Sequence, residues 1–127
     1  MSGSETAIFF GDSANGAACF RQLEAALLLR YPSMETRVQK TQISFYDGGL
    51  FCCVSLPRGG RMRGSAIVVT FGLNVPIADP RVAELVEPYP ERWTHHVPVF
   101  GPEEIDEQLL AWIDWAHSFK RRAKRRR

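Results

Sequence analysis

Apolar and polar residues alternate along residues 37–56 in a way that predicts two strands folded back on each other. The turn is expected at Asp47-Gly48, because both central positions of the favoured hairpin turn need positive φ, and Gly49 is a candidate for an added bulge. Residues 50–56 (LFCCVSL) are apolar at both odd and even positions, which is typical of a central strand covered on two faces. The rest of the chain is expected to extend or cover this sheet.

Residues 35–46 contain a change of phase. Val38 lies on the even positions, whereas Ile43 and Phe45 lie on the odd positions. Since strand side chains alternate between faces, the change requires a bulge, a twist or a turn near Lys40-Thr41. Two interpretations follow, a bulge that re-aims polar side chains beside a functional site or the corner of a hairpin.

Residues 14–30 are expected to form an amphipathic helix. Its apolar side chains recur at spacings of three and four, at Phe20, Leu23, Leu27 and Tyr31. Asp12 or Ser13 can cap its start by accepting a hydrogen bond from a free amide, and Pro32 marks its end. The apolar run 8–10 is expected to pack as a short edge segment or as a hydrophobic staple.

Two further strands are expected in the second half of the chain. Residues 66–73 (AIVVTFGL) form a β-branched run that predicts a second central strand, antiparallel to the first. Residues 92–100 predict an edge strand, because Pro98 cannot donate to a ladder of hydrogen bonds. One face of that strand would carry Trp93, His95, Val97 and Val99, and the other Thr94, His96 and Phe100.

Residues 74–90 hold four prolines and are typical of a loop. Within them, Asp79-Pro80 is expected to start a short helical turn. That turn would place three apolar side chains inward, Val82, Leu85 and Val86.

A last helix is expected from Pro102 to about Phe119, since proline is tolerated at a helix start. Two acids follow at the positive end of its dipole. The predicted buried stripe consists of Ile105, Leu109, Trp112, Ile113 and Ala116. Trp115 lies off this stripe with Phe119, so the two are expected to cover the flank of the domain or a partner.

Together these elements predict an α+β fold, an antiparallel sheet of four to five strands with N-terminal and C-terminal helices packed on one side. A chain of 127 residues, 45% of them hydrophobic, is long enough for one compact core. The prediction is a single domain over residues 1–119 and a basic disordered tail over residues 120–127.

Charge is distributed unevenly along the chain. Residues 120–127 (KRRAKRRR) hold seven of the sixteen Lys and Arg residues and no acid. Residues 1–119 therefore hold nine basic and fourteen acidic residues, a net charge of minus five. The pI near 8.6 is a property of the tail and does not predict a basic surface on the domain.

Three cysteines, Cys19, Cys52 and Cys53, are an odd number without the spacing of a metal site. This argues against both a disulfide framework and a zinc knuckle. The N-terminal sequence has no basic segment ahead of a long apolar stretch, and no segment reaches the ~20 apolar residues of a membrane span. We expect a cytoplasmic protein without a cofactor.

Several short motifs occur in an order that resembles a known family. They are Lys40-Thr41-Gln42-Ile43-Ser44-Phe45, Asp79-Pro80-Arg81, Val86-Glu87-Pro88, Arg92-Trp93-Thr94-His95-His96-Val97, and a closing helix with Ala111-Trp112 and Trp115-Ala116. Over about residues 9–119 the chain resembles a bacterial and archaeal domain of unknown function. The resemblance implies a small intracellular α+β domain, found alone or fused behind nuclease-like domains, with no established reaction.

More remotely, the layout is similar to the YdhG-like domains, which are sometimes described as iron chaperones. This sequence lacks the cluster of carboxylate, cysteine and histidine that would transfer such a role. The loop 57–64 (PRGGRMRG) and the basic tail lie outside the family pattern, so a function resting on them would belong to this protein alone.

One candidate site is a polar patch contributed by the irregular strand and the edge strand. Its members are cationic, hydroxyl-bearing or aromatic, namely Lys40, Thr41, Ser44, Arg81, Arg92, Trp93 and His95. If they meet in one hollow, they suit a phosphate, a carboxylate or a nucleotide. The alternative is that Lys40 and Arg92 are edge charges, that Trp93 belongs to the core and that the histidines are structural.

No metal site and no catalytic residue is predicted. His95 and His96 are adjacent in a strand and point to opposite faces, so they cannot chelate one ion. Cys52 and Cys53 lie in an apolar run, where a thiol is inert without a cationic neighbour. The acids of the domain lie mostly in loops or at a helix start, where solvation or the dipole accounts for them.

The tail is a second candidate site, for nucleic acid. Its basic residues are Lys120, Arg121, Arg122, Lys124, Arg125, Arg126 and Arg127. Such a run neutralises several phosphates and gives salt-dependent binding without sequence preference. Contact with acidic lipid and plain solvation are the alternatives.

The sequence therefore predicts a non-enzymatic binding module for an anionic ligand, either phosphate, a nucleotide or nucleic acid. One alternative is an interaction or assembly protein, a homodimer whose face is formed by Trp115 and Phe119. Another is an enzyme of undetermined type.

Overall fold

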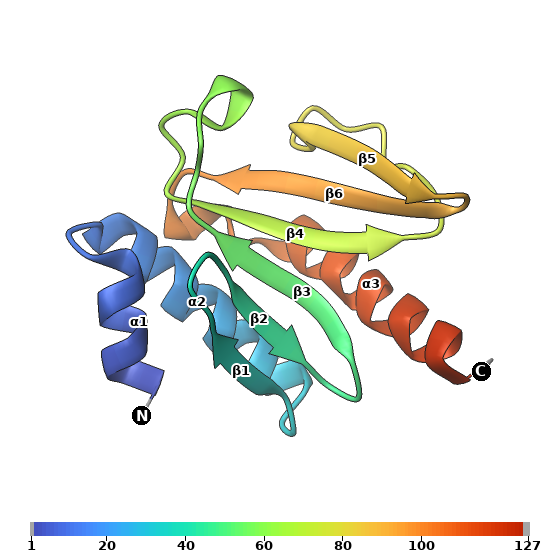
Figure 1. Cartoon of the computed structure of the whole chain (residues 1–127), viewed down its shortest axis with the longest axis horizontal. Helices are drawn as coiled ribbons and strands as arrows, with labels where there is room; N and C mark the ends of the chain where they lie inside the picture. Colours follow the sequence, from blue (N-terminus) through green and yellow to red (C-terminus); the bar gives the residue numbers. More distant parts are fainter. Residues whose placement is uncertain (1, 126–127) are drawn as a thin grey trace.

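The computed structural model describes the backbone of residues 2–125 and the side chains of residues 5–120. Two helices precede a sheet, and a third long helix follows it (Figure 1). The elements are α1 (Ser2–Phe10), α2 (Ala14–Arg30), β1 (Glu35–Val38), β2 (Ile43–Tyr46), β3 (Leu50–Ser55), the 3₁₀ turn η1 (Gly60–Met62), β4 (Ile67–Leu73), β5 (Glu84–Tyr89), β6 (Arg92–Val99), the 3₁₀ turn η2 (Pro102–Glu104) and α3 (Glu107–Arg125).

The sheet confirms the predicted α+β class. Its strands lie in the order β1-β2-β3-β4-β6-β5, and every neighbouring pair is antiparallel. Helices α2 and α3 pack against one face, as expected, while the strands number six instead of four to five (Figure 1). We call the face turned away from α2 and α3 the open face.

The core lies between the sheet and the two helices. Four alternate side chains of β4 point towards the helices and are buried, namely Ile67, Val69, Phe71 and Leu73. The same cluster contains Leu23 and Leu27 of α2 and Leu109 and Ile113 of α3. Each buried side chain of this size contributes about 1.5–3 kcal/mol. A one-residue slip would expose the whole row, so this layer fixes which residues lie on the open face.

The N-terminal segment differs from the prediction. The run 8–10 belongs to the helix α1 and is neither an edge segment nor a staple. The prediction was wrong because three apolar residues are too few to show a helical or a strand period. Phe10 is buried against Phe20 of α2, with ring centroids 5.6 Å apart. The cap of α2 is as predicted, since Ser13 Oγ accepts a hydrogen bond from Gly16 N–H at 3.0 Å.

The change of phase before Ile43 is a hairpin corner. Val38 pairs with Ile43 across the β1–β2 turn, which Gln39 N–H closes by donating to Gln42 O at 2.9 Å. A bulge does occur, but in the next hairpin, where the β2–β3 register shifts between Phe45 and Tyr46. The predicted turn at Asp47 is present in that hairpin.

Strand β5 was missed by the sequence analysis. The expected loop and helical turn bury Val82, but Leu85 and Val86 are 37% and 43% exposed on an edge strand, where proline is tolerated. Strand β6 is consequently not an edge strand, since it lies between β4 and β5. Pro98 is tolerated because β5 pairs with β6 only as far as His96.

The last helix extends further than predicted. α3 begins at Glu107, after η2, and its backbone continues to Arg125, so residues 120–125 continue the helix instead of starting a disordered tail. Residues 126–127 lie outside the described part of the chain. Among the described helices, none combines the length and the apolar composition needed to cross a membrane.

Candidate functional site

One row of side chains on the open face is polar in all six strands. Pairing places these residues next to each other from β1 to β5, in the order Arg37, Ser44, Cys53, Thr70, His96 and Glu84. Directly opposed side chains in neighbouring strands have Cβ atoms about 4.5–5.5 Å apart. The row, which we call the polar row, is therefore a continuous line of hydrogen-bonding groups across the sheet.

Hydrogen bonds connect two neighbouring pairs of the polar row, Ser44 with Cys53 and Thr70 with His96. Thr70 Oγ1 lies 2.8 Å from His96 Nδ1. Two glutamines of the β1–β2 turn hold the other half, since Ser44 Oγ donates to Gln39 Oε1 at 2.8 Å and Gln42 Nε2 donates to Ser44 Oγ at 3.0 Å. The polar turn that follows β1 thus serves to fix the β2 end of the row.

The central groups of the polar row are uncharged near neutral pH. Burial raises the pKa of the Cys53 thiol, and its hydrogen bond with Ser44 only partly opposes this. Burial also lowers the pKa of His96, which Glu84 opposes and Arg58 reinforces. Cys53 is therefore a protonated thiol and not a nucleophilic thiolate, and the row can both donate and accept neutral hydrogen bonds.

A cleft opens beside the polar row because β3 and β4 separate. Three residue pairs join these strands, the last of them Cys53 with Thr70, and beyond it the strands diverge (Figure 1). The cleft, which we call the β3–β4 cleft, has a volume of about 290 Å³. It is lined by Leu50, Phe51, Cys52, Cys53, Thr70, Phe71, Gly72, Pro88, Tyr89, Arg92, Thr94, Ala116, Phe119 and Lys120.

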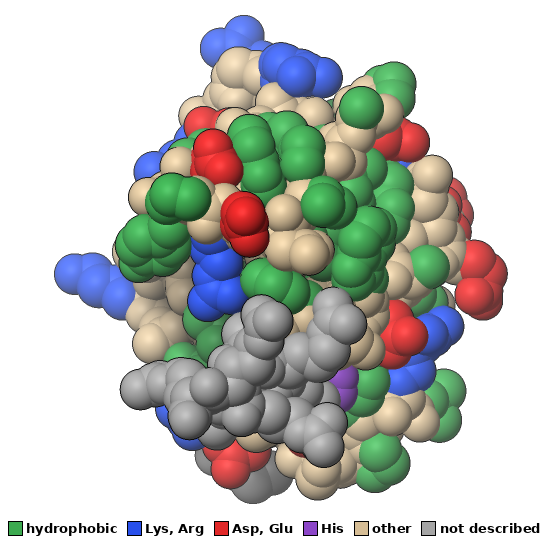
Figure 2. Space-filling view, turned by 90° about the vertical axis from the view of Figure 1, so that its right-hand side faces the viewer, with side chains coloured by type: hydrophobic (Ala, Val, Ile, Leu, Met, Phe, Trp, Pro, Cys, Tyr) green, Lys and Arg blue, Asp and Glu red, His purple; other side chains and the backbone are tan. Residues whose placement is uncertain are grey.

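Hydrophobic side chains gather on this side of the molecule, with both basic and acidic side chains among them (Figure 2). Two basic residues line the cleft. The Arg92 guanidinium lies 5.2 Å from the ring centroid of Phe119, and Lys120 Nζ donates to the Asp47 carbonyl and lies 5.9 Å from the ring of Phe51. The cleft therefore combines apolar walls with two positive charges.

The seven residues predicted as one ligand patch do not share one hollow. Ser44 belongs to the polar row and Arg92 to the β3–β4 cleft, while Lys40 is exposed in the β1–β2 turn. Thr41 lines a second hollow on the open face. These four therefore lie at different places and do not form one site.

Trp93 and His95 point to the opposite side, towards the helices, because they alternate with Thr94 and His96. His95 is fully buried and stacks on Phe71, with ring centroids 5.2 Å apart. Its Nε2 accepts from Ile77 N–H at 3.1 Å, so Nδ1 carries the proton and donates to Trp93 O at 3.1 Å. The structural interpretation of this histidine is the correct one.

Arg81 is also on the helical side. Its guanidinium donates to Asp106 at 2.9 and 3.1 Å, to Gln108 at 3.0 Å and to the Glu104 carbonyl at 2.9 Å. These bonds tie the loop before β5 to the start of α3. The geometric basis of the predicted patch was therefore wrong for Arg81, Trp93 and His95, whereas ligand binding by the others stays a prediction.

Sequence reasoning overlooked Cys53, Thr70, Thr94 and His96 as open-face groups. The strand pattern did place Thr94 and His96 on the same face. The residues around them, however, do not indicate which face of the sheet is left uncovered by helices. The basic residues 121–127 of the predicted tail site have side chains outside the described residues. Among the described residues, no three His, Cys, Asp or Glu side chains gather as a metal site would require.

Comparison with known families matches residues 5–120 to the family described as Domain of unknown function (DUF5655). The chain belongs to the DUF5655 family. The resemblance inferred from the motifs is thereby confirmed, while the fusions to nuclease-like domains remain an expectation. No curated protein and no solved structure matches this DUF5655 domain.

A second polar cluster of the DUF5655 domain lies at the end of α3. Asp47 in the β2–β3 turn accepts a hydrogen bond from His117 at 2.7 Å and another from Ser33 at 3.1 Å. Tyr31 stacks on His117, with ring centroids 3.9 Å apart, and donates its hydroxyl hydrogen to Asp114. This cluster fastens the β2–β3 turn and the end of α2 to α3, and so fixes one wall of the β3–β4 cleft.

The predicted dimer face is only partly exposed in the DUF5655 domain. Trp115 is 42% exposed on α3. Phe119 instead lines the β3–β4 cleft beneath Arg92. Association through these two residues stays a prediction.

Two histidines predict a loss of stability of the DUF5655 domain in mild acid. Burial lowers the pKa of His95 and of His96 from the ordinary 6.5, so the unfolded chain binds more protons below that pH. The contribution of the two histidines to the free energy of unfolding is therefore expected to be fully present above pH ~6.5. It is lost as the pH drops through their pKa values in the folded state.

Two carboxyls add a second loss in stronger acid. The hydrogen bond from His117 lowers the pKa of Asp47, while burial of Asp106 would raise its pKa but the hydrogen bonds from Arg81 and Leu109 N–H lower it. Their contribution is present above the unfolded value of 3.8 and is lost below it. Urea unfolding between about pH 7.5 and 3 measures both losses, and equal stability at about pH 7.5 and 4.5 would contradict the first.

Proposed function

We propose that this DUF5655 domain is a non-enzymatic binding module whose ligand is a nucleotide-like anion held in the β3–β4 cleft. The observation that carries the proposal is the separation of β3 from β4, which leaves a hollow of about 290 Å³ with apolar walls and two basic side chains. Small-molecule sites begin at about 300 Å³ and combine an apolar lining with a few placed polar groups. The cleft has such a lining, and its volume lies just below the lower end of that range.

The lining supports a ligand with a planar apolar part and an anionic part. Tyr89 and Phe119 offer aromatic surface for a flat ring. Arg92 and Lys120 offer charge-assisted hydrogen bonds to a phosphate or carboxylate at the rim. Binding is favoured over covalent catalysis because burial raises the pKa of both thiols that line the cleft, Cys52 and Cys53, so both are protonated near neutral pH.

Cytidine 5′-monophosphate (CMP) is a suitable probe, and cytidine, which lacks the phosphate, is the uncharged compound for comparison. Titration calorimetry is expected to show CMP binding more tightly than cytidine, because only CMP carries the group that Arg92 contacts. Replacement of Arg92 by alanine is expected to raise the Kd for CMP about tenfold, the effect of losing one charged hydrogen bond. The melting temperature should change little, since Arg92 is exposed.

Arg21→Ala is the matched control. Arg21 is an exposed arginine on α2, on the other side of the sheet, so its loss changes the net charge equally without touching the cleft. Equal CMP affinity of the Arg92→Ala and Arg21→Ala proteins would reject the site. Failure of the unaltered protein to bind CMP would reject the nucleotide as its ligand class.

A further inference from the structure

The β3–β4 cleft adjoins a second hollow on the open face. The second hollow has a volume of about 260 Å³ and shares Cys53 and Thr70 with the cleft. It is lined by Thr41, Gln42, Cys53, Ser55, Leu56, Arg58, Met62, Val68, Thr70, Glu84 and His96. The two hollows follow β3 from Leu50 to Leu56, a length of about 20 Å for an extended strand.

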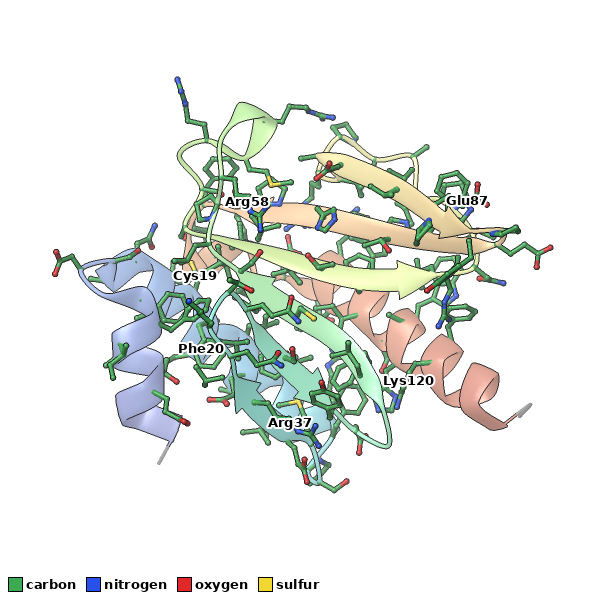
Figure 3. The ribbon with its side chains drawn as sticks, viewed as in Figure 1. Cys19, Phe20, Arg37, Arg58, Glu87 and Lys120 are labelled. Carbon is green, nitrogen blue, oxygen red and sulfur yellow. The ribbon has the colours of Figure 1, made fainter. Side chains whose placement is uncertain are left out.

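We call the two hollows together the groove. Basic side chains lie at both of its ends. Arg58 lines the second hollow, and Lys120 lines the cleft at the opposite end of β3 (Figure 3). The loop that supplies Arg58 also carries Arg61 and Arg63, and Arg61 NH1 donates to the Ala83 carbonyl at 2.9 Å, which holds the loop over β5. Beyond Lys120 the sequence adds six Lys and Arg residues in 121–127.

Basic side chains outnumber acids in the lining of the groove. Arg58, Arg92 and Lys120 line it, and the acid among its described lining residues is Glu84. The net charge of minus five over residues 1–119 therefore does not describe the groove. A polyanion is attracted by the local arrangement of charge at the groove and not by the net charge of the domain.

The middle of the groove is suited to nucleobase edges. Thr70, His96 and Cys53 are neutral groups that donate and accept hydrogen bonds. Glu84 lies beside His96 and accepts hydrogen bonds, so it favours a base with an amino group, as a carboxylate does when it accepts from cytosine N4. Glu84 would repel a phosphate at this point.

We propose that the groove binds single-stranded nucleic acid, with neighbouring nucleotides in the two hollows and backbone phosphates against Arg92, Lys120 and Arg58. Two hollows of similar volume in series fit a repeating ligand, and basic side chains at both ends with aromatic side chains in the β3–β4 cleft are the elements of a single-strand site. The inference rests on the proposed function, because the first nucleotide occupies the β3–β4 cleft.

Fluorescence anisotropy of the full chain with labelled oligonucleotides of about ten deoxycytidines or deoxyuridines tests this site. The deoxycytidine strand is expected to bind at least about tenfold more tightly than CMP. Arg58→Ala should cost the strand about tenfold in affinity and cost CMP far less, whereas Arg92→Ala weakens both. Arg21→Ala should weaken neither, and Glu84→Gln should reduce the preference for deoxycytidine over deoxyuridine.

The outcomes separate the two proposals. Suppose that Arg92→Ala weakens CMP binding but Arg58→Ala leaves the affinity for the strand unchanged. This result would overturn the groove and leave the proposed function in place. A duplex hairpin that binds as tightly as the single strand would also overturn the groove, since the tail alone would then explain the affinity. The groove would also be overturned if Arg58→Ala weakened binding to vesicles that contain phosphatidylserine but did not weaken binding to the strand. No CMP binding by the unaltered protein overturns both.

Discussion

Phe45→Ala is expected to lower the free energy of unfolding by about 3–5 kcal/mol. Phe45 is fully buried in β2 and stacks on Phe20 of α2, with ring centroids 6.0 Å apart and planes within 8°. Its removal leaves a cavity between the sheet and α2 that neighbouring side chains fill only in part. A small domain has about 5–15 kcal/mol of stability in total, so this loss is a large share.

Urea unfolding followed by circular dichroism measures the change, and Leu29→Ala is the control. Leu29 lies on α2 but is 86% exposed, so the same kind of truncation should alter stability by no more than about 0.5 kcal/mol. Equal losses for the two variants would contradict the packing of α2 on the sheet described above.

His117→Ala is expected to lower the free energy of unfolding by about 2–4 kcal/mol. The substitution removes the ring that stacks on Tyr31 and leaves the Asp47 carboxylate, whose side chain is 14% exposed, without its shortest hydrogen bond. The end of α3 and the β2–β3 turn should loosen together, because Asp47 connects them. Faster amide hydrogen exchange in the turn is therefore expected as well.

His117→Phe separates the two contributions. Phenylalanine keeps a ring for Tyr31 but cannot donate to Asp47, so the expected loss is about 1–2 kcal/mol. If His117→Phe were as destabilising as His117→Ala, the hydrogen bond would account for the whole effect. If neither variant changed the exchange of the turn, the cluster would not fasten it to α3.

The elements that the sequence predicted well are those with a long, consistent hydrophobic pattern. The predicted helix 14–30 keeps Phe20, Leu23 and Leu27 buried in α2 and its capping serine at the N-terminus, and Tyr31 is the C-cap. β4 lies within the predicted strand 66–73 because its β-branched run leaves no helical alternative. β5 was missed because Pro88 and Pro90 suggested a loop, whereas an edge strand has one side free of ladder hydrogen bonds and accepts proline.

The site was harder to predict than the fold because it depends on register. Each face of β6 carries one histidine, and the residues around them contain no reason to prefer His96 to His95. Thr70 lies 26 positions before His96, and only the pairing of β4 with β6 shows that they adjoin. Arg81 was assigned to the patch by chemistry alone, but Asp106 and the Glu104 carbonyl hold it on the helical side.

The limited pairing of β3 with β4 has a consequence for how such a domain can change over evolution. Three residue pairs, from Cys53 to Ser55 on β3, are the seam between two three-stranded halves of the sheet. Substitutions at Leu50, which is 43% exposed, can alter where the seam opens without disturbing the core beneath it. Relatives with a shorter or longer hairpin would thus accept ligands of different size on an unchanged scaffold.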